Sequence, residues 1–246
     1  MSTRYLVGVD DTDNLESRGT GHRARQLGDL LGRCGMHLRG VTRHQLFVSP
    51  AIPYTSHNSA ACLEVLSADE SSTRLIGLCR DFVRADSAPG SDAGICIAVA
   101  SSVAPAVADF GARAKHLVLD MTEAETLARQ NQMHLEPLTG TGLGIIGALA
   151  AVGLRAAAGD GRFLWLPGLR ELTGVHRAAL LRERLDLDGV ETEAGTVVDD
   201  RDRVQVGEWP RPLLRAGRRV FLVEESGHED VRWVGLNRER LKQLSG

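Results

Sequence analysis

The sequence of residues 4–22 is RYLVGVDDTDNLESRGTGH, and this segment predicts both the start of the fold and its chemistry. The apolar run 5–9 indicates a buried strand, and Asp10, Asp11 and Asp13 follow that strand directly. Three carboxylates so close together repel one another unless a cation or a strong donor lies among them. Carboxylate oxygens suit Mg²⁺, which commonly bridges an acid and substrate phosphates. We therefore expect Asp10, Asp11 and Asp13 to hold Mg²⁺.

The RGTGH motif that follows predicts a phosphate site beside these acids. A helical pattern begins here, and N–H groups at a helix start favour an anion. We expect Gly19, Thr20 and Gly21 to donate from the backbone, and Arg18 to pair with a phosphate oxygen through its forked guanidinium. His22 and Thr20 are the candidate phosphoacceptors or acid–base groups. The alternative is a solvated acid-rich loop, since Asp and Asn are ordinary turn residues.

The bulk composition is that of an ordinary globular protein. Its 246 residues suffice for one large domain or two small ones, and 43% hydrophobic with 25% charged residues is typical of this class. No apolar run is long enough for a transmembrane helix and no signal peptide is evident, so we expect a cytoplasmic protein without membrane contact. The net charge of −3 argues against a large non-specific nucleic-acid surface, although tRNA stays open as a partner.

The spacing of the cysteines and the absence of a phosphate-loop motif limit the kinds of functional site that the sequence can encode. No C-x-x-C pair occurs, so we expect small buried residues rather than zinc ligands or disulfides at Cys34, Cys62, Cys79 and Cys96. The sequence has no G-x-x-x-x-G-K-S/T loop, which excludes an ordinary Walker-type phosphate site.

Strand and helix patterns alternate up to about residue 130, which favours an α/β fold with mixed (α+β) sheets over an all-parallel sheet. The expected strands are 4–9, 40–42, 46–48, 60–66 and 94–99, and the expected helices are 20–34, 69–84 and 145–154. After residue 160, short β-like runs alternate with turns and with one helix near 175–185. We therefore expect a nucleotide-binding α/β region at 1–160 and a smaller mixed α/β subdomain at 161–246.

A second glycine cluster, Gly142, Gly144 and Gly147, formally matches G-x-G-x-x-G. A dinucleotide site needs an apolar strand immediately before it, and we do not expect one at 134–139. Two interpretations stay open: the loop holds a phosphate or a carbonyl at a helix start, or its small residues only let the helix pack closely. Gly142, Gly144 and Asn58, which lies in a polar loop before an expected strand, are candidates to complete the pocket.

Four motifs follow one another along the chain: GVDDTD at 8–13, IP at 52–53 with Asn58 before a strand, PG at 89–90 before a strand, and GIIGALAAVG at 144–153. This order resembles the archaeal isoleucine-tRNA agmatinylcytidine synthetase family, over residues 4–166. The resemblance implies a kinase-like domain that carries the acidic motif, with an inserted or following ferredoxin-like domain. It also implies ATP-driven attachment of agmatine to an anticodon cytidine.

Two departures from the family pattern bear on the chemistry. The family's phosphorylated threonine corresponds to His22 here and Thr20 lies two positions earlier, so His22 or Thr20 takes that role or the step is absent. No cysteine follows Cys96, so we expect the family's C-terminal zinc ribbon, and tRNA capture in the same form, to be missing.

These features together predict an ATP-dependent transferase or ligase that uses Mg²⁺ and ATP. The expected reaction is phosphoryl transfer to, or ATP-driven activation of, a small or nucleotide-like acceptor, with Asp10 and Asp11 at the catalytic centre. The alternatives are a non-catalytic nucleotide-binding protein and an RNA-modification subunit that needs a partner for tRNA capture.

Overall fold

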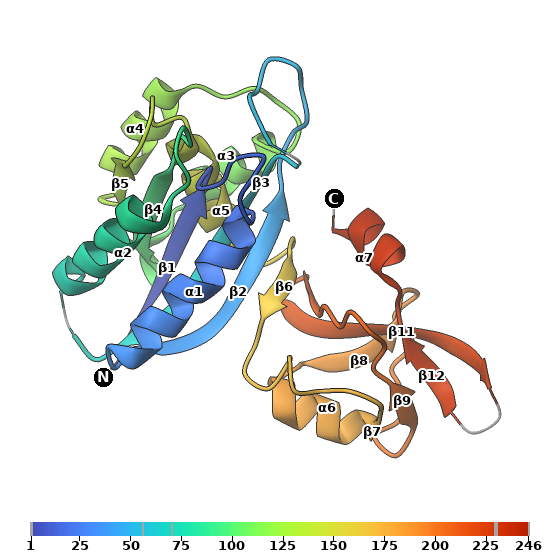
Figure 1. Cartoon of the computed structure of the whole chain (residues 1–246). Helices are drawn as coiled ribbons and strands as arrows, with labels where there is room; N and C mark the ends of the chain where they lie inside the picture. The colour runs from blue at the N-terminus through green and yellow to red at the C-terminus, as the bar shows by residue number, and fades with distance from the viewer. Residues whose placement is uncertain (1, 56, 70, 229–230, 246) are drawn as a thin grey trace. The chain divides into compact units, whose positions relative to one another are not determined.

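The computed structural model describes residues 2–55, 57–69, 71–228 and 231–245, which form two compact units. The first unit is Met1–Ala157 and the second is Ala158–Gly246. Each unit has its own hydrophobic core and combines helices with β-sheet, so the chain is a mixed α/β protein (Figure 1). None of the helices in the described ranges is both long and apolar enough to cross a membrane.

An antiparallel sheet in the order β5-β4-β1-β3-β2 forms the centre of the first unit. Its strands are β1 (Thr3–Asp10), β2 (His37–Gln45), β3 (Ser59–Ser67), β4 (Gly94–Val99) and β5 (His134–Pro137). In the central strand β1, Val9 lies opposite Ala61 of β3 and Ile95 of β4. The last residue of β1, Asp10, therefore lies beside the starts of both neighbouring strands.

Helices cover both faces of this sheet (Figure 1). On one face lie α1 (Thr20–Arg33), which contacts β2 and β3, and α2 (Thr73–Asp86), which contacts β4. On the other face lie α3 (Pro105–Arg113), α4 (Met121–Gln130) and α5 (Gly144–Ala157), with a short 3-10 turn, η1 (Ala100–Ser102), before α3. Helix α5 packs directly on β1 and β4.

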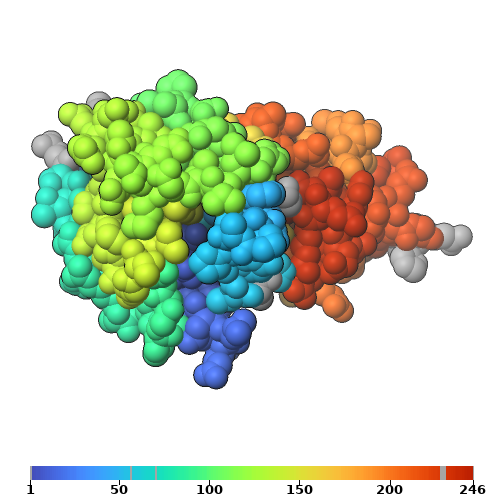
Figure 2. Space-filling view, turned by 90° about the horizontal axis from the view of Figure 1, so that it is seen from above, coloured from blue at the N-terminus to red at the C-terminus, as the bar shows by residue number. Residues whose placement is uncertain are grey.

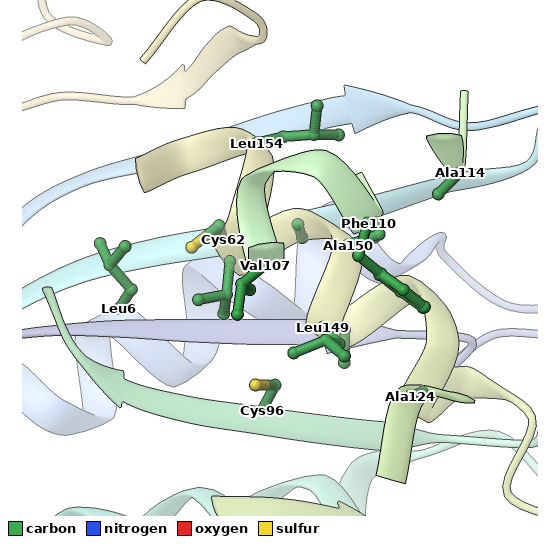
Figure 3. Close-up of a cluster of buried hydrophobic side chains, with 14 of the residues drawn as sticks. Leu6, Cys62, Cys96, Val107, Phe110, Ala114, Ala124, Leu149, Ala150 and Leu154 are labelled. Atoms are coloured by element: carbon green, nitrogen blue, oxygen red, sulfur yellow. The ribbon is translucent and has the colours of Figure 1, made fainter. Parts of the chain in front are cut away.

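Small and aliphatic side chains fill the space between the sheet and helices α3 to α5 (Figure 3). Cys62 and Cys96 belong to this cluster from the sheet, and Phe110 belongs to it from α3. Burial raises the pKa of the Cys62 thiol to about 12, so the group stays protonated and behaves as a small apolar side chain. All four cysteines are free. Cys62, Cys79 and Cys96 are buried, as expected from the sequence, whereas Cys34 is only half-buried.

Helix α5 approaches β1 closely because Gly8 has no side chain. A Cβ at this position would overlap with the carbonyl oxygen of Ala148 in α5. Gly94 plays the same part in β4, where a Cβ would overlap with the backbone at Ile145. The start of α5 is therefore pressed against the end of β1 and the start of β4.

The second unit contains a sheet in the order β6-β10-β11-β12-β9-β7, with β8 parallel beside β11. Its strands are β6 (Arg162–Trp165), β7 (Val175–Arg177), β8 (Gly189–Thr192), β9 (Arg203–Gln205), β10 (Leu213–Arg215), β11 (Arg218–His228) and β12 (Val231–Gly235). Leu181 and Leu185 of α6 (Ala178–Leu185) belong to one buried cluster of this unit, and Leu241 of α7 (Arg238–Leu244) belongs to another.

Three expected elements differ in the structure. Residues 46–48 are not a strand. The Leu46 N–H still donates to the Asn58 carbonyl at 2.9 Å, but the Phe47 N–H donates to the Ala114 carbonyl at 2.9 Å, outside the β2–β3 pairing. Residues 134–137 do form a strand, β5, because their backbone pairs with β4 at the sheet edge. That pairing is antiparallel, unlike the parallel strand of a dinucleotide site. The helix expected near 175–185 begins only at Ala178, since the preceding residues pair with β9.

Candidate functional site

A pocket of about 170 Å³ opens in the first unit at the end of β1. Its walls come from residues 10–13 with Thr20, from the loop between β2 and β3, from residues 114–119 after α3, and from residues 143–146 at the start of α5. In Figure 2, dark blue N-terminal atoms are visible between the yellow-green and light blue surfaces. The acidic turn predicted from the sequence therefore lies in a pocket.

Asp10, the last residue of β1, is half-buried and lies against the start of α5. A Cβ on Gly147 would overlap with Asp10 Oδ2, so this glycine leaves the space that the carboxylate occupies. Burial, followed by the charges of Asp11 and Asp13, raises the pKa of Asp10 from 3.8 to about 8, while Arg43 opposes that rise. A bound cation would stabilise the charged form of this carboxyl group.

Asp11 follows in a left-handed backbone conformation, with a φ of 51°. Burial raises its pKa to about 6, and the charges of Asp92 and Asp13 act in the same direction. Two adjacent carboxyl groups with raised pKa values that face one pocket are typical of a functional site.

Asp13 makes hydrogen bonds through both carboxylate oxygens. Its Oδ1 accepts from the Thr20 N–H at 3.0 Å and from the Thr20 hydroxyl at 2.8 Å, and its Oδ2 accepts from the Thr55 hydroxyl at 2.8 Å. The first amide of α1 is therefore capped by an aspartate seven residues upstream. In this structure the Thr20 N–H already donates to the carboxylate of Asp13, so its role as a donor to a phosphate stays a prediction.

The glycine loop at 140–144 also surrounds an aspartate of the chain itself. Asp92 accepts hydrogen bonds from the N–H of Thr141, from the hydroxyl of Thr141 at 2.9 Å and from the N–H of Gly142 at 3.2 Å. The Gly144 N–H donates to the Asp92 carbonyl oxygen at 2.9 Å. The N–H groups of Gly142 and Gly144 therefore already have acceptors within the chain, and the expectation that they hold a phosphate stays a prediction. Of these two glycines, Gly144 lines the pocket.

The remaining residues of the RGTGH motif lie apart from the pocket. Arg18 and Gly19 are exposed, and neither they nor Gly21 and His22 belong to the described pocket lining. His22 lies in the first turn of α1, where its Nδ1 is 3.3 Å from a guanidinium nitrogen of Arg25. Burial and the surrounding arginines lower the His22 pKa, so its imidazole is neutral at pH 7. Thr20, in contrast, lines the pocket.

Asn58 lines the pocket, as expected, and its side-chain amide donates to the Phe47 carbonyl at 2.6 Å. This bond and the Leu46–Asn58 bond close the base of the loop between β2 and β3. Sequence reasoning missed Arg43 of β2, a half-buried guanidinium whose Nε donates to Ser59 Oγ at 2.9 Å beside the pocket. A lone arginine in a strand gives no signal of such a position.

Sequence reasoning also missed the apolar wall of the pocket. Tyr54, Leu117 and Val118 line it although they are 44%, 51% and 52% exposed. The Phe47 N–H donates to the Ala114 carbonyl at 2.9 Å, which ties the two segments carrying these side chains together. The pocket thus has an acidic corner and an apolar lip, an arrangement that suits a ligand with both charged and flat apolar parts.

The fit of these acids to Mg²⁺ depends on which carboxylates still have room for it. Within the described ranges no three His, Cys, Asp or Glu residues are grouped so that they could hold a metal ion. Asp10 and Asp11 remain candidates, whereas both oxygens of Asp13 already accept hydrogen bonds. Two carboxylates fit Mg²⁺, which is commonly bound by one or two acids together with substrate phosphates and water.

Comparison with known proteins gives one curated relative. It is the isoleucine-tRNA 2-agmatinylcytidine synthetase TiaS of Cenarchaeum symbiosum (strain A), which is 26% identical over 152 residues, covering 61% of this chain and 33% of TiaS. The chain resembles the catalytic region of TiaS. No protein-family model matches it.

Solved structures agree with this resemblance to TiaS. The structure of TiaS in complex with an isoleucine tRNA and ATP aligns with a TM-score of 0.52 at 24% identity, covering 61% of this chain and 36% of that one, and shows a shared fold. A tRNA fluorescent labelling enzyme aligns with the same TM-score and coverage at 26% identity. The chain spans about a third of the length of these relatives.

Proposed function

We propose that this chain binds Mg²⁺ and ATP in the acidic pocket and uses them as an ATP-dependent transferase or ligase. The observation that carries the proposal is the pair Asp10 and Asp11, two carboxyl groups with raised pKa values that face one pocket. The resemblance to TiaS supports the ligand class, because TiaS is known in complexes with ATP, AMPCPP and agmatine. Assignment of the matched region as kinase-like and ferredoxin-like, and a cytoplasmic location, belong to the same proposal.

Asp10 and Asp11 would hold Mg²⁺, which would supply positive charge to offset the negative charge of the phosphates. Thr20 is the proposed phosphoacceptor in preference to His22, because Thr20 lines the pocket and Asp13 holds its hydroxyl in place through a hydrogen bond. Arg18, Gly19 and Gly21 are proposed to contact only the part of a ligand that extends beyond the pocket.

Calorimetric titration of ATP with and without Mg²⁺ tests this proposal directly. We expect binding that requires Mg²⁺, and an affinity at least tenfold lower in Asp10→Asn and in Asp11→Asn. Asp109→Asn is the matched control, because Asp109 is an exposed acid whose partner is Arg113 of the same helix. Equal ATP affinity in the wild type and in Asp10→Asn would reject the site.

A non-catalytic nucleotide-binding protein is the second candidate. It is favoured by the hydrogen bonds that Thr12 makes to the Thr20 hydroxyl oxygen, at 3.2 Å from its N–H and at 3.1 Å from its own hydroxyl. These bonds occupy the lone pairs that an attacking oxygen would use. Incubation with ATP and Mg²⁺, followed by measurement of ADP, AMP and protein-bound phosphate, separates the candidates: an enzyme forms at least one of them, and a binding protein forms none.

An RNA acceptor is the third candidate, because one solved relative is a TiaS complex with an isoleucine tRNA. A salt-sensitive shift of tRNA by the purified chain, or RNA that co-purifies with it, would support this acceptor class. Failure of tRNA to bind at low salt, with ATP hydrolysis intact, would leave a small molecule as the acceptor.

A further inference from the structure

The pocket loop between β2 and β3 is held at three places. At its base, Asn58 accepts a hydrogen bond from the Leu46 N–H and donates one to the Phe47 carbonyl. At its flank, Phe47 bonds to Ala114. Near its tip, the Thr55 hydroxyl donates to Asp13 Oδ2, across 42 residues of sequence. The tip carries the apolar side chains that line one wall of the pocket.

We infer that Asp13 is a positioning residue that joins the start of α1 to the pocket loop, and that it is not a ligand of the metal. The Asp13 junction consists of Asp13, Thr20 and Thr55, and all three residues line the pocket. The effect of the Asp13 junction on ATP binding rests on the proposed function, whereas its effect on the position of the loop does not.

The geometry separates Asp13 from the two acids before it. Three donors from two segments already point at its oxygens at 2.8–3.0 Å. A cation bound by both oxygens of Asp13 would compete with the cap on the first amide of α1 and with the bond to the loop tip. Asp10 and Asp11 can bind a cation without breaking either connection. In the acidic turn, Asp10 and Asp11 are therefore available to a ligand, whereas Asp13 holds the wall of the pocket in place.

The effect of the junction on the loop is tested in the ligand-free protein by hydrogen–deuterium exchange. Thr55→Val removes the hydroxyl with little change in shape, so we expect exchange in peptides covering 47–55 to become at least fivefold faster. Thr55→Ser restores the donor and should exchange like the wild type. Thr126→Val on the exposed face of α4 is the matched control and should leave these peptides unchanged. Unchanged exchange in Thr55→Val would overturn the junction, whether or not ATP binds.

The metal part of the inference is tested by the Mg²⁺ concentration that gives half-maximal ATP binding. Asp13→Asn keeps an Oδ1 acceptor for Thr20 and a side-chain amide that can bond to the Thr55 hydroxyl oxygen, but it removes the charge. We expect its Mg²⁺ midpoint to stay within twofold of the wild type, whereas Asp10→Asn should shift it at least tenfold. Thr55→Val should weaken ATP binding about fivefold at saturating Mg²⁺ with an unchanged midpoint.

Two results distinguish a failure of this inference from a failure of the proposed function. A midpoint in Asp13→Asn that shifts as far as in Asp10→Asn would make Asp13 a metal ligand and overturn the inference, while the proposed function would stand. Absence of ATP binding to the wild type would reject the proposed function, and the exchange experiment would then decide on the junction alone.

Discussion

At the scale of single residues, Asp10 and Gly147 depend on each other. The carboxylate of Asp10 occupies the place where any larger residue at position 147 would put its Cβ. The glycine therefore has a specific role beyond close helix packing, because it allows a carboxyl group to stay at the start of a helix that is pressed against the sheet. Of the two interpretations of the second glycine cluster, the structure supports close packing, which Gly144 and Gly147 allow at the pocket; binding of a phosphate there stays a prediction.

Gly147→Ala should displace the Asp10 carboxylate. The overlap of its Cβ with Asp10 Oδ2 forces a shift, so we expect a loss of about 1–3 kcal/mol in the free energy of unfolding. We also expect Mg²⁺-dependent ATP affinity to fall at least tenfold. Chemical denaturation and calorimetric titration measure the two effects. Gly32→Ala is the control, because a Cβ there meets nothing within 4 Å in α1, and it should be neutral or slightly stabilising. Wild-type values for Gly147→Ala would refute the dependence.

Asp10→Asn should change how stability varies with pH. The folded pKa of Asp10 is raised from 3.8 to about 8, so the fold favours the protonated form and loses stability as the pH rises through that range. The asparagine variant lacks this loss. In metal-free buffer we expect it to be about 1–3 kcal/mol more stable than the wild type at pH 8.5, with a much smaller difference near pH 5. A difference in the free energy of unfolding that does not vary with pH would contradict the raised pKa.

At the scale of elements, the loop before α5 shows which features of the fold can be predicted from local sequence patterns and which cannot. Strand 5–9, the acids at its end and the helix that begins at Thr20 are local patterns, so the sequence predicted them. The partners of the glycine loop were not predictable, because Asp92 reaches it across 49 residues. A glycine-rich turn at a helix start has the same sequence whether its donors face a phosphate or an internal aspartate. The same holds for the Asp13 junction, which no local pattern encodes.

Asp92→Ala should loosen that loop. Three donors from Thr141 and Gly142 would lose their acceptor, so we expect the free energy of unfolding to fall by about 2–3 kcal/mol. Exchange of the amides at 139–143 should accelerate. Asp109→Ala removes an exposed acid that pairs with Arg113 in the same helix, and it should cost about 0.5 kcal/mol or less. Equal losses in the two variants would show that Asp92 does not organise the loop.

At the scale of the whole molecule, the described lining of the acidic pocket comes entirely from the first unit. The second unit has two buried clusters of its own, one built around α6 and one around α7. Its strands are short and its sequence is rich in arginine and aspartate, so no local pattern predicted how the strands pair. Their pairing through β11 became clear only from the structure. Ligand binding should therefore stabilise one unit directly and leave the core of the other untouched.

Mg²⁺ and ATP should protect the first unit selectively. At a concentration one hundred times the dissociation constant, a ligand that binds only the folded state adds about 2.7 kcal/mol to its stability. We expect slower hydrogen–deuterium exchange within residues 1–157, strongest around Asp10, Thr55 and the start of α5, and unchanged exchange in the core strands of 158–245. Asp10→Asn should weaken the protection at the same ligand concentration, because a tenfold lower affinity reduces the added stability to about 1.4 kcal/mol. Equal protection in the cores of both units would mean that the binding site, or the cooperative unit that it stabilises, extends beyond the acidic pocket.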